Sequence, residues 1–203
     1  MSGPGADIEF WFDFTSPYAY FASLEVDTVA ARHGRGVRWK PFLLGAVFKT
    51  TGMQALTRMP LRGDYARHDW QRLARRLSVP FAFPAVHPAH TVAAGRAFLW
   101  IEEAAPASAV PYAKAVFAAH FGRGEDIGPA ERVIGIAGAV GVDPGALAAG
   151  LESPAIKDRF RARSEEATAR GVFGSPFFIV DGEPFWGADR LPMIEEWLAR
   201  GGW

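Results

Sequence analysis

The chain has 203 residues with 22 basic and 22 acidic side chains, and this balance leaves no basic field to recruit nucleic acid or an anionic membrane surface. Hydrophobic residues make up 49% of the sequence, enough to fill the core of one domain, or of one domain with an insertion. No stretch approaches the roughly 18 uncharged apolar residues of a membrane span, and the first residues do not read as a secretion signal. We therefore expect a cytoplasmic protein whose partner is a small molecule.

The first elements form a strand–helix–strand unit. Residues 8–14 read as a strand, and Ser16-Pro17 then starts a helix, because Ser is a favoured N-cap and Pro lacks only an N–H that has no partner in the first turn. Residues 37–42 form the next strand. Such starts are common, and Asp143-Pro144 and Ser153-Pro154 are two others. On these residues alone, Ser16 is either a helix cap or a functional hydroxyl.

Helical periodicity dominates the long middle of the chain, from residue 45 to 170. Segments rich in Pro and Gly interrupt it. The predicted helices cover residues 67–77, 91–103, 112–120, 131–140 and 156–170.

A second proline opens the last β segment. Residues 177–181 and 184–186 predict a hairpin, and residues 191–200 predict a final helix. Pro176 stands directly before the hairpin, where a trans peptide bond is the default, because only about 5–6% of X-Pro bonds in folded proteins are cis. The first two strands must pair in parallel, so the order of elements predicts an α/β fold with a long helical excursion before the hairpin.

Together these segments resemble one family. Ser16-Pro17-Tyr18-Ala19 occupies the helix start at which thiol oxidoreductases of the thioredoxin superfamily carry Cys-Pro-x-Cys. The other motifs are Trp39-Lys-Pro-Phe-Leu-Leu-Gly45, Phe48-Lys-x-x-Gly52, Gly171-Val-Phe-Gly-Ser-Pro176 and Val180-Asp-Gly-Glu-Pro-Phe-Trp-Gly-Ala-Asp-Arg-Leu191. Their order and spacing resemble the 2-hydroxychromene-2-carboxylate isomerases and kappa-class glutathione transferases, which form a DsbA-like branch of that superfamily.

The resemblance implies a fold and its boundaries. It implies an α/β fold, with a thioredoxin-like domain from residues 1–44 and 171–203 and a large all-helical insertion at residues 45–170. It also implies that the Ser175-Pro176 bond is cis and that it faces the start of the Ser16 helix.

The resemblance also implies a cofactor. The chain contains no cysteine, so the sulfur for any thiol chemistry must come from outside, and the family points to glutathione. In the family, a serine in the place of Ser16 activates the glutathione thiol, and the backbone of the residue before the cis-Pro, here Ser175 before Pro176, binds the cysteinyl part. The turn that contains Trp186, Gly187 and Asp189 binds the γ-glutamyl end. A simple N-cap role in the last helix is the alternative for Asp189.

The sequence departs from the family at several positions. Ala188 stands where kappa-class transferases have Ser, and Met53 stands where the isomerases commonly have Asn. The segment His87-Pro88-Ala89-His90 replaces their Phe-Pro-Gln-Asn. We expect both histidines to be loop or surface residues, because a proline separates them and no cysteine or carboxylate lies near in the sequence. No metal site is predicted.

Several further residues are candidates for the site. Lys40 could contact a carboxylate of glutathione or of the substrate, although a solvated lysine is the commoner situation. Trp39 and Phe42, with Met53 and His90, are candidates for a wall around an aromatic substrate, although aromatic side chains suit a core equally well. Asp13 is either a partly buried acid that tunes the site or a loop-facing residue.

These resemblances predict a glutathione-dependent isomerase that forms a homodimer. In the family reaction, the glutathione thiolate adds reversibly to a hydroxychromene carboxylate, rotation follows about a bond that was double, and expulsion of the thiolate gives a trans benzylidenepyruvate. A kappa-like glutathione transferase is the alternative enzyme. A redox-inactive thioredoxin-like binding module is the alternative outside catalysis.

Overall fold

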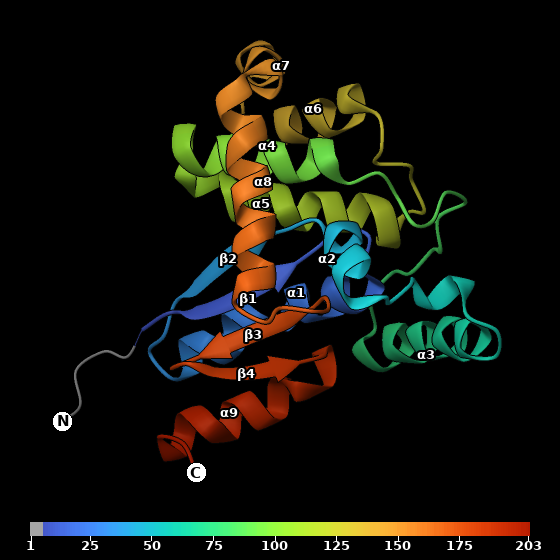
Figure 1. The fold of residues 1–203 in the computed structure, drawn as a ribbon, viewed down its shortest axis with the longest axis vertical. Coiled ribbons are helices and arrows are strands. Elements are labelled where there is room, and N and C mark those ends of the chain that lie inside the picture. The colour runs from blue at the N-terminus through green and yellow to red at the C-terminus, as the bar shows by residue number, and fades with distance from the viewer. Residues whose placement is uncertain (1–5) are drawn as a thin grey trace.

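The computed structural model describes residues 6–203 and contains, within that range, a four-stranded sheet in the order β2-β1-β3-β4 (Figure 1). Strand β1 (Ile8–Phe12) pairs in parallel with β2 (Val37–Pro41), and β3 (Phe177–Val180) pairs antiparallel with both β1 and β4 (Glu183–Trp186). Helix α1 (Pro17–Arg32) joins the parallel pair. The predicted strand–helix–strand unit and the hairpin are confirmed, and they have the arrangement expected of a thioredoxin-like domain.

Helices fill the chain between β2 and β3. In order, these are α2 (Leu44–Thr51), the 3-10 turn η1 (Leu56–Arg58), α3 (Arg62–Leu77), α4 (Val92–Ala104), α5 (Pro106–Phe117), the π-helical turn η2 (Ala118–Gly122), α6 (Ala130–Ala139), α7 (Pro144–Glu152) and α8 (Pro154–Ala169). The 3-10 turn η3 (Ala188–Arg190) and helix α9 (Leu191–Arg200) follow β4. Among residues 6–203, no helix combines the length and the apolarity needed to span a bilayer.

The structure adds two helices to those predicted and lengthens two others. Helices α2 and α7 were not predicted, and α3 and α5 begin earlier than their periodic segments. Helix α7 begins where the Asp143 carboxylate accepts a hydrogen bond from the Ala146 N–H (2.9 Å), a capping bond that stabilises a helix of nine residues. Helix α5 continues through Pro111, because this proline removes only one backbone donor and one face of the helix is buried.

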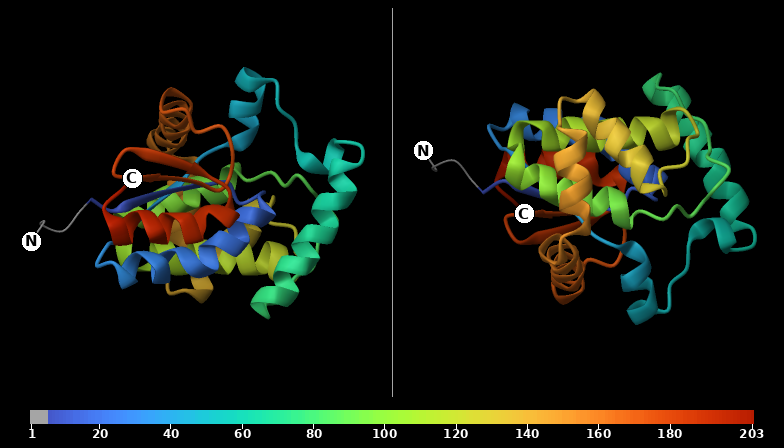
Figure 2. Two further views of the ribbon diagram at one scale, coloured as in Figure 1. Left: turned by 90° about the horizontal axis from the view of Figure 1, so that it is seen from below. Right: turned by 90° about the horizontal axis from the view of Figure 1, so that it is seen from above.

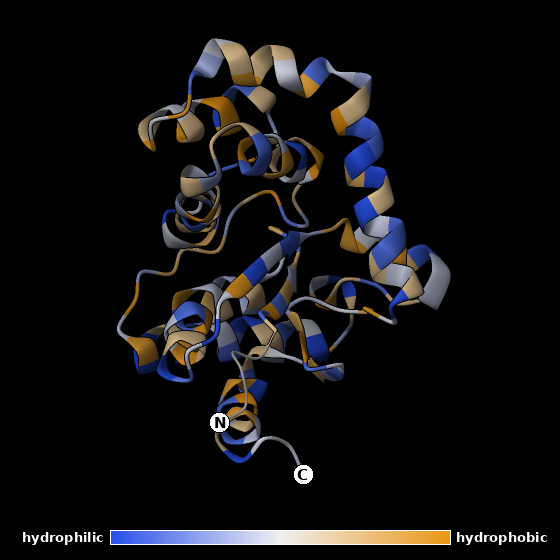
Figure 3. Cartoon of the chain, turned by 90° about the vertical axis from the view of Figure 1, so that its left-hand side faces the viewer, coloured by the Kyte–Doolittle hydropathy of each residue, from blue (hydrophilic) through white to orange (hydrophobic). Residues whose placement is uncertain are grey.

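The sheet divides the hydrophobic core into two layers. Phe10 and Phe12 point to the side of α1, α4, α5 and α9, and Trp11 points to the side of α2 and α8, as the alternation of side chains along a strand requires. Figure 2 shows α1 and α9 side by side on one face of the sheet and α8 on the other. Most of α8 is hydrophilic in Figure 3.

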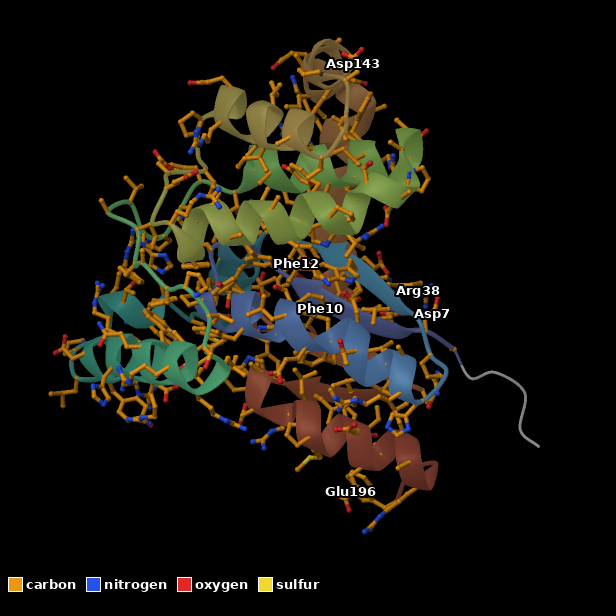
Figure 4. All side chains as sticks on the ribbon, turned by 180° about the vertical axis from the view of Figure 1, so that it is seen from behind. Asp7, Phe10, Phe12, Arg38, Asp143 and Glu196 are labelled. Atoms are coloured by element: carbon orange, nitrogen blue, oxygen red, sulfur yellow. The ribbon has the colours of Figure 1, made fainter. Side chains whose placement is uncertain are left out.

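Phe12 joins the sheet to the helices that the chain inserts between β2 and β3. Its ring lies 5.8 Å from that of Phe98 on α4 and 5.6 Å from that of Phe117 on α5, measured between centroids. It also contacts Trp39 on β2, with centroids 5.5 Å apart. In Figure 4, Phe10 and Phe12 are labelled where β1 passes beneath the helical layer. The sheet and these helices therefore share one core, whose packing holds the end of β1 in place.

Truncation of Phe12 should destabilise both parts of the structure at once. Phe12→Ala removes a fully buried ring and leaves a cavity between the sheet and the helices, so we expect the free energy of unfolding to fall by about 3–5 kcal/mol. Urea unfolding followed by circular dichroism measures this loss. Leu24→Ala, on the exposed side of α1, is the control and should change stability by less than about 1 kcal/mol. Equal losses in the two variants would contradict the assigned role of Phe12.

Candidate active site

A large cavity of about 1460 Å³ opens at the carboxyl end of β1, where α1 begins. Its walls come from the β1–α1 loop, the segment from α2 to α3, the loop before α4, the loop before β3 and the segment from β4 to α9. Figure 2 shows the chain from α2 to α3, coloured cyan to green, at the edge of the molecule. Residues of this segment line the cavity. Chain segments that are far apart in the sequence therefore meet at one place.

Ser16 lies at the base of the cavity and caps α1. Its Oγ accepts a hydrogen bond from the Ala19 N–H (3.2 Å), and its hydroxyl donates to the Ser175 carbonyl oxygen (2.6 Å). Pro17 occupies the first helical position. The cap predicted from Ser16-Pro17 is confirmed, and the second bond connects this cap to the loop before β3.

The loop before β3 faces the start of α1, as the resemblance implied. The Ser175-Pro176 peptide bond is cis, which confirms that prediction. The Ser175 hydroxyl accepts a hydrogen bond from the Asp13 N–H (2.9 Å), and the Gly187 N–H donates to the Pro176 carbonyl oxygen (3.1 Å). Gly174 has no space for a side chain, since a Cβ there would collide with the indole of Trp186. The loop is thus held from both sides.

Asp13 is a buried acid beneath the site and not a loop-facing residue. Its Oδ1 accepts from the Thr15 N–H (3.0 Å) and its Oδ2 accepts from the Leu44 N–H (2.8 Å). Burial raises the pKa of the Asp13 carboxyl, and hydrogen bonds from Thr15, Thr91 and Leu44 offset part of the rise. A carboxylate with these partners organises the backbone beneath Ser16.

The turn after β4 forms the far wall of the cavity. Gly187 has φ +112°, a conformation that side chains rarely adopt, and Trp186 is about half exposed beside it. The Asp189 carboxylate is 74% exposed and lies 3.6 Å from Arg190. Asp189 lies in η3, and Arg190 is the N-cap of α9, without a side-chain capping bond. The N-cap alternative for Asp189 is therefore wrong.

Three residues that the sequence placed at the site do not line the cavity. Lys40 lies on the α8 side of the sheet, where its Nζ is 2.8 Å from Glu166 and 4.4 Å from the centre of the Trp11 ring. Trp39 and Phe42 are buried in the core. The register of β2 against β1 explains this, because it places Lys40 beside Trp11 and Trp39 beside Phe10, away from the cavity at the end of the strands.

The remaining candidate residues line the wall of the cavity that is formed by the segment from α2 to α3 and by the loop before α4. Met53 and His90 line it, together with His87, which is partly buried rather than on the surface. Arg58 on η1 and Arg62 on α3 also line the cavity and form no ion pair within residues 6–203. The sequence analysis missed both arginines, because only the packing of η1 and α3 places them in the lining of this cavity.

Helix α3 is connected to α1 across the cavity. The Tyr18 hydroxyl donates to the Asp69 carboxylate (3.0 Å), and burial raises the pKa of Tyr18 well above its usual value. Tyr18 is therefore a neutral donor here and supplies no base. Within residues 6–203, no group of three or more His, Asp or Glu side chains is placed to hold a metal ion.

Comparisons with known proteins agree with this geometry. The model of the DsbA-like thioredoxin domain family matches residues 7–199. A 2-hydroxychromene-2-carboxylate isomerase of Pseudomonas putida is 30% identical over 197 residues, which cover 95% of this chain and 94% of that protein. The kappa 1 glutathione S-transferase of Caenorhabditis elegans is 27% identical over 208 residues, covering 94% of this chain and 90% of that protein.

A solved structure is similar over nearly the whole chain. The crystallised selenomethionine form of a 2-hydroxychromene-2-carboxylate isomerase superposes with a TM-score of 0.86 at 29% identity, covering 95% of this chain and 94% of that one. The chain therefore belongs to the DsbA-like thioredoxin family, in the group that contains the 2-hydroxychromene-2-carboxylate isomerases and the kappa-class glutathione transferases.

Proposed function

We propose that this protein is a glutathione-dependent isomerase of 2-hydroxychromene-2-carboxylates. One observation carries the proposal: the Ser16 hydroxyl lies at the start of α1, against the cis-Pro loop and at the base of a large cavity, in a chain without cysteine. The isomerases among its relatives support this choice of reaction.

The residues around the cavity fit glutathione. The Ser175 backbone at the cis-Pro loop suits the cysteinyl part, and the exposed Asp189 carboxylate suits an ammonium group such as that of the γ-glutamyl end. Trp186 and Gly187 form the turn beside it. Arg62 carries a positive charge without an ion-pair partner in residues 6–203, which suits a carboxylate and replaces the contact first considered for Lys40.

Ser16 would stabilise a thiolate above the start of α1. Its hydroxyl now donates to the Ser175 carbonyl oxygen, and the same hydrogen can turn toward a sulfur in the cavity. A hydrogen bond to a charged group contributes about 1.5–3 kcal/mol, and a helix N-terminus about 0.3–1 kcal/mol. Because one pKa unit is about 1.4 kcal/mol, these two effects together lower a thiol pKa by about one to three units.

The remaining chemistry follows from this placement. When bound, glutathione supplies a thiolate that adds reversibly to an electrophilic carbon of the substrate and leaves again after bond rotation. The apolar part of the wall, with Phe48, Met53 and Trp70, would hold the aromatic rings and keep water from them. A glutathione transferase is the second candidate, and the kappa-class relatives favour it.

Loss of the Ser16 hydroxyl should reduce catalysis strongly and stability only slightly. Ser16→Ala should cost about 1 kcal/mol of stability through the lost cap and should remove most of the turnover of 2-hydroxychromene-2-carboxylate, because the thiolate loses its side-chain donor. Asp143→Ala is the matched control, since it removes a capping side chain from α7, far from the cavity. Its activity should be normal. Full activity in folded Ser16→Ala would leave Ser16 only a cap.

Turnover should require an external thiol. The chain has no cysteine, so iodoacetamide should leave the isolated protein unchanged, and removal of glutathione by dialysis should abolish the isomerisation rate. S-methylglutathione should compete with glutathione without supporting the reaction, because it lacks an ionisable sulfur. Undiminished rates in the dialysed enzyme would refute thiol dependence.

Arg62 should matter for affinity more than for the rate. Arg62→Ala removes a charged donor from the cavity wall, so the KM for glutathione should rise about tenfold, with a smaller change in kcat. Arg161→Ala, an exposed position on α8, is the control and should leave both constants unchanged. Initial rates against glutathione concentration decide this, and an unchanged KM in Arg62→Ala would exclude the contact.

A further inference from the structure

His87 occupies an aromatic pocket at the edge of the cavity. Its ring lies 4.9 Å from that of Phe83 and 6.3 Å from that of Trp70, measured between centroids. The loop that carries it is joined to the start of α1, because the Ala89 N–H donates to the Thr15 hydroxyl (3.0 Å), one residue before Ser16. His87 therefore belongs to the wall of the candidate site.

A histidine in this pocket costs stability. The Nδ1 atom of His87 is buried and has no hydrogen-bond partner within residues 6–203, and such a polar atom is costly to leave unpaired. A phenylalanine here would fill the same aromatic pocket without a polar atom. A histidine at this position therefore needs a role that a phenyl ring cannot fill, such as hydrogen bonding through its ring nitrogens.

His120 is the other histidine beside this pocket, and it also has an unpaired ring nitrogen. The His120 ring is fully buried, 6.3 Å from that of His87, and its Nδ1 lies 2.8 Å from the Glu125 carbonyl oxygen. A carbonyl oxygen only accepts, so this Nδ1 carries the hydrogen and the Nε2 of neutral His120 is an acceptor. That Nε2 is also buried without a partner in the described chain. A bridging water that accepts from His87 Nδ1–H and donates to His120 Nε2 would satisfy both atoms.

With its hydrogen on Nδ1, His87 would have an unprotonated Nε2, in a residue that lines the cavity. Burial, together with the neighbouring His120 and Arg67, lowers the pKa of His87 to about 4. Burial also lowers the pKa of His120, while the Glu125 carbonyl and Asp126 act in the opposite direction. At neutral pH the imidazole is therefore an uncharged hydrogen-bond acceptor.

We propose that His87 determines substrate specificity by accepting, at Nε2, a hydrogen bond from the hydroxyl group of a hydroxyaryl carboxylate substrate. The inference rests on the proposed function and adds the group that selects the substrate. A hydroxychromene carboxylate carries such a hydroxyl on its hemiketal carbon, and the ring-opened isomer carries one on the aromatic ring. A site built to accept from a hydroxyl rejects an analogue that lacks the hydrogen.

Two stable probes test this selectivity. By calorimetry with S-methylglutathione present, the protein should bind trans-2-hydroxycinnamate about tenfold more tightly than trans-2-methoxycinnamate. His87→Phe should abolish the preference, because a phenyl ring cannot accept the hydrogen bond. His68→Phe, an exposed position on α3 outside the cavity, is the control and should keep the preference. An unchanged preference in His87→Phe, no preference in the native protein, or failure of both probes to bind would overturn the inference.

Nitrogen-15 NMR of the imidazole rings gives a readout independent of activity. His87 should carry its hydrogen on Nδ1 at pH 7 and titrate near pH 4, and in His120→Phe the Nδ1–H form should lose its dominance. A hydrogen on Nε2 in the native protein would overturn the inference. Turnover without hydroxyl preference would refute only the role of His87, whereas hydroxyl preference without glutathione-dependent turnover would refute only the proposed reaction.

Discussion

The buried carboxylate of Asp13 is the constraint on which the candidate site depends. It holds the N–H groups of Thr15 and Leu44, and the backbone N–H of Asp13 itself donates to the Ser175 hydroxyl. These bonds join the start of α1, the start of α2 and the cis-Pro loop, which lie far apart in the sequence. They reinforce the direct hydrogen bond from the Ser16 hydroxyl to the Ser175 carbonyl oxygen (2.6 Å). The geometry of the site thus depends on one buried acid, which also borders the cavity.

The sequence predicts those features of the structure that depend on neighbouring residues in the chain. The cap at Ser16, the helix after it and the hairpin after Pro176 depend on neighbouring residues, and each is present in the structure. The positions of Lys40 and Arg62 depend instead on strand register and on the packing of α3, which no short motif encodes. Lys40, on the edge strand β2 and beside Trp11, forms an ion pair with Glu166 on α8. Sequence motifs therefore predict the residues around Ser16 better than they predict the residues that line the rest of the cavity.

The two sides of the cavity differ in how they are supported. The side with Ser16 rests on the shared aromatic core around Phe12, where the sheet and the inserted helices pack together. The side with η1 and α3 lies at the edge of the molecule and is connected to α1 by the Tyr18–Asp69 bond. Changes such as Met53 and His87 fall on that peripheral wall.

The helix start at Ser16 has the geometry of a thiol active site, yet the chain holds no sulfur that peroxide could convert to a sulfenic acid there. An enzyme that carries its own reactive cysteine stops when that atom is oxidised. Here, on the proposed function, the oxidisable atom belongs to a diffusible molecule that the cell replaces continuously. Oxidative stress would then lower the rate by depleting the reduced thiol pool, and activity would return as soon as that pool recovers, with no repair of the protein.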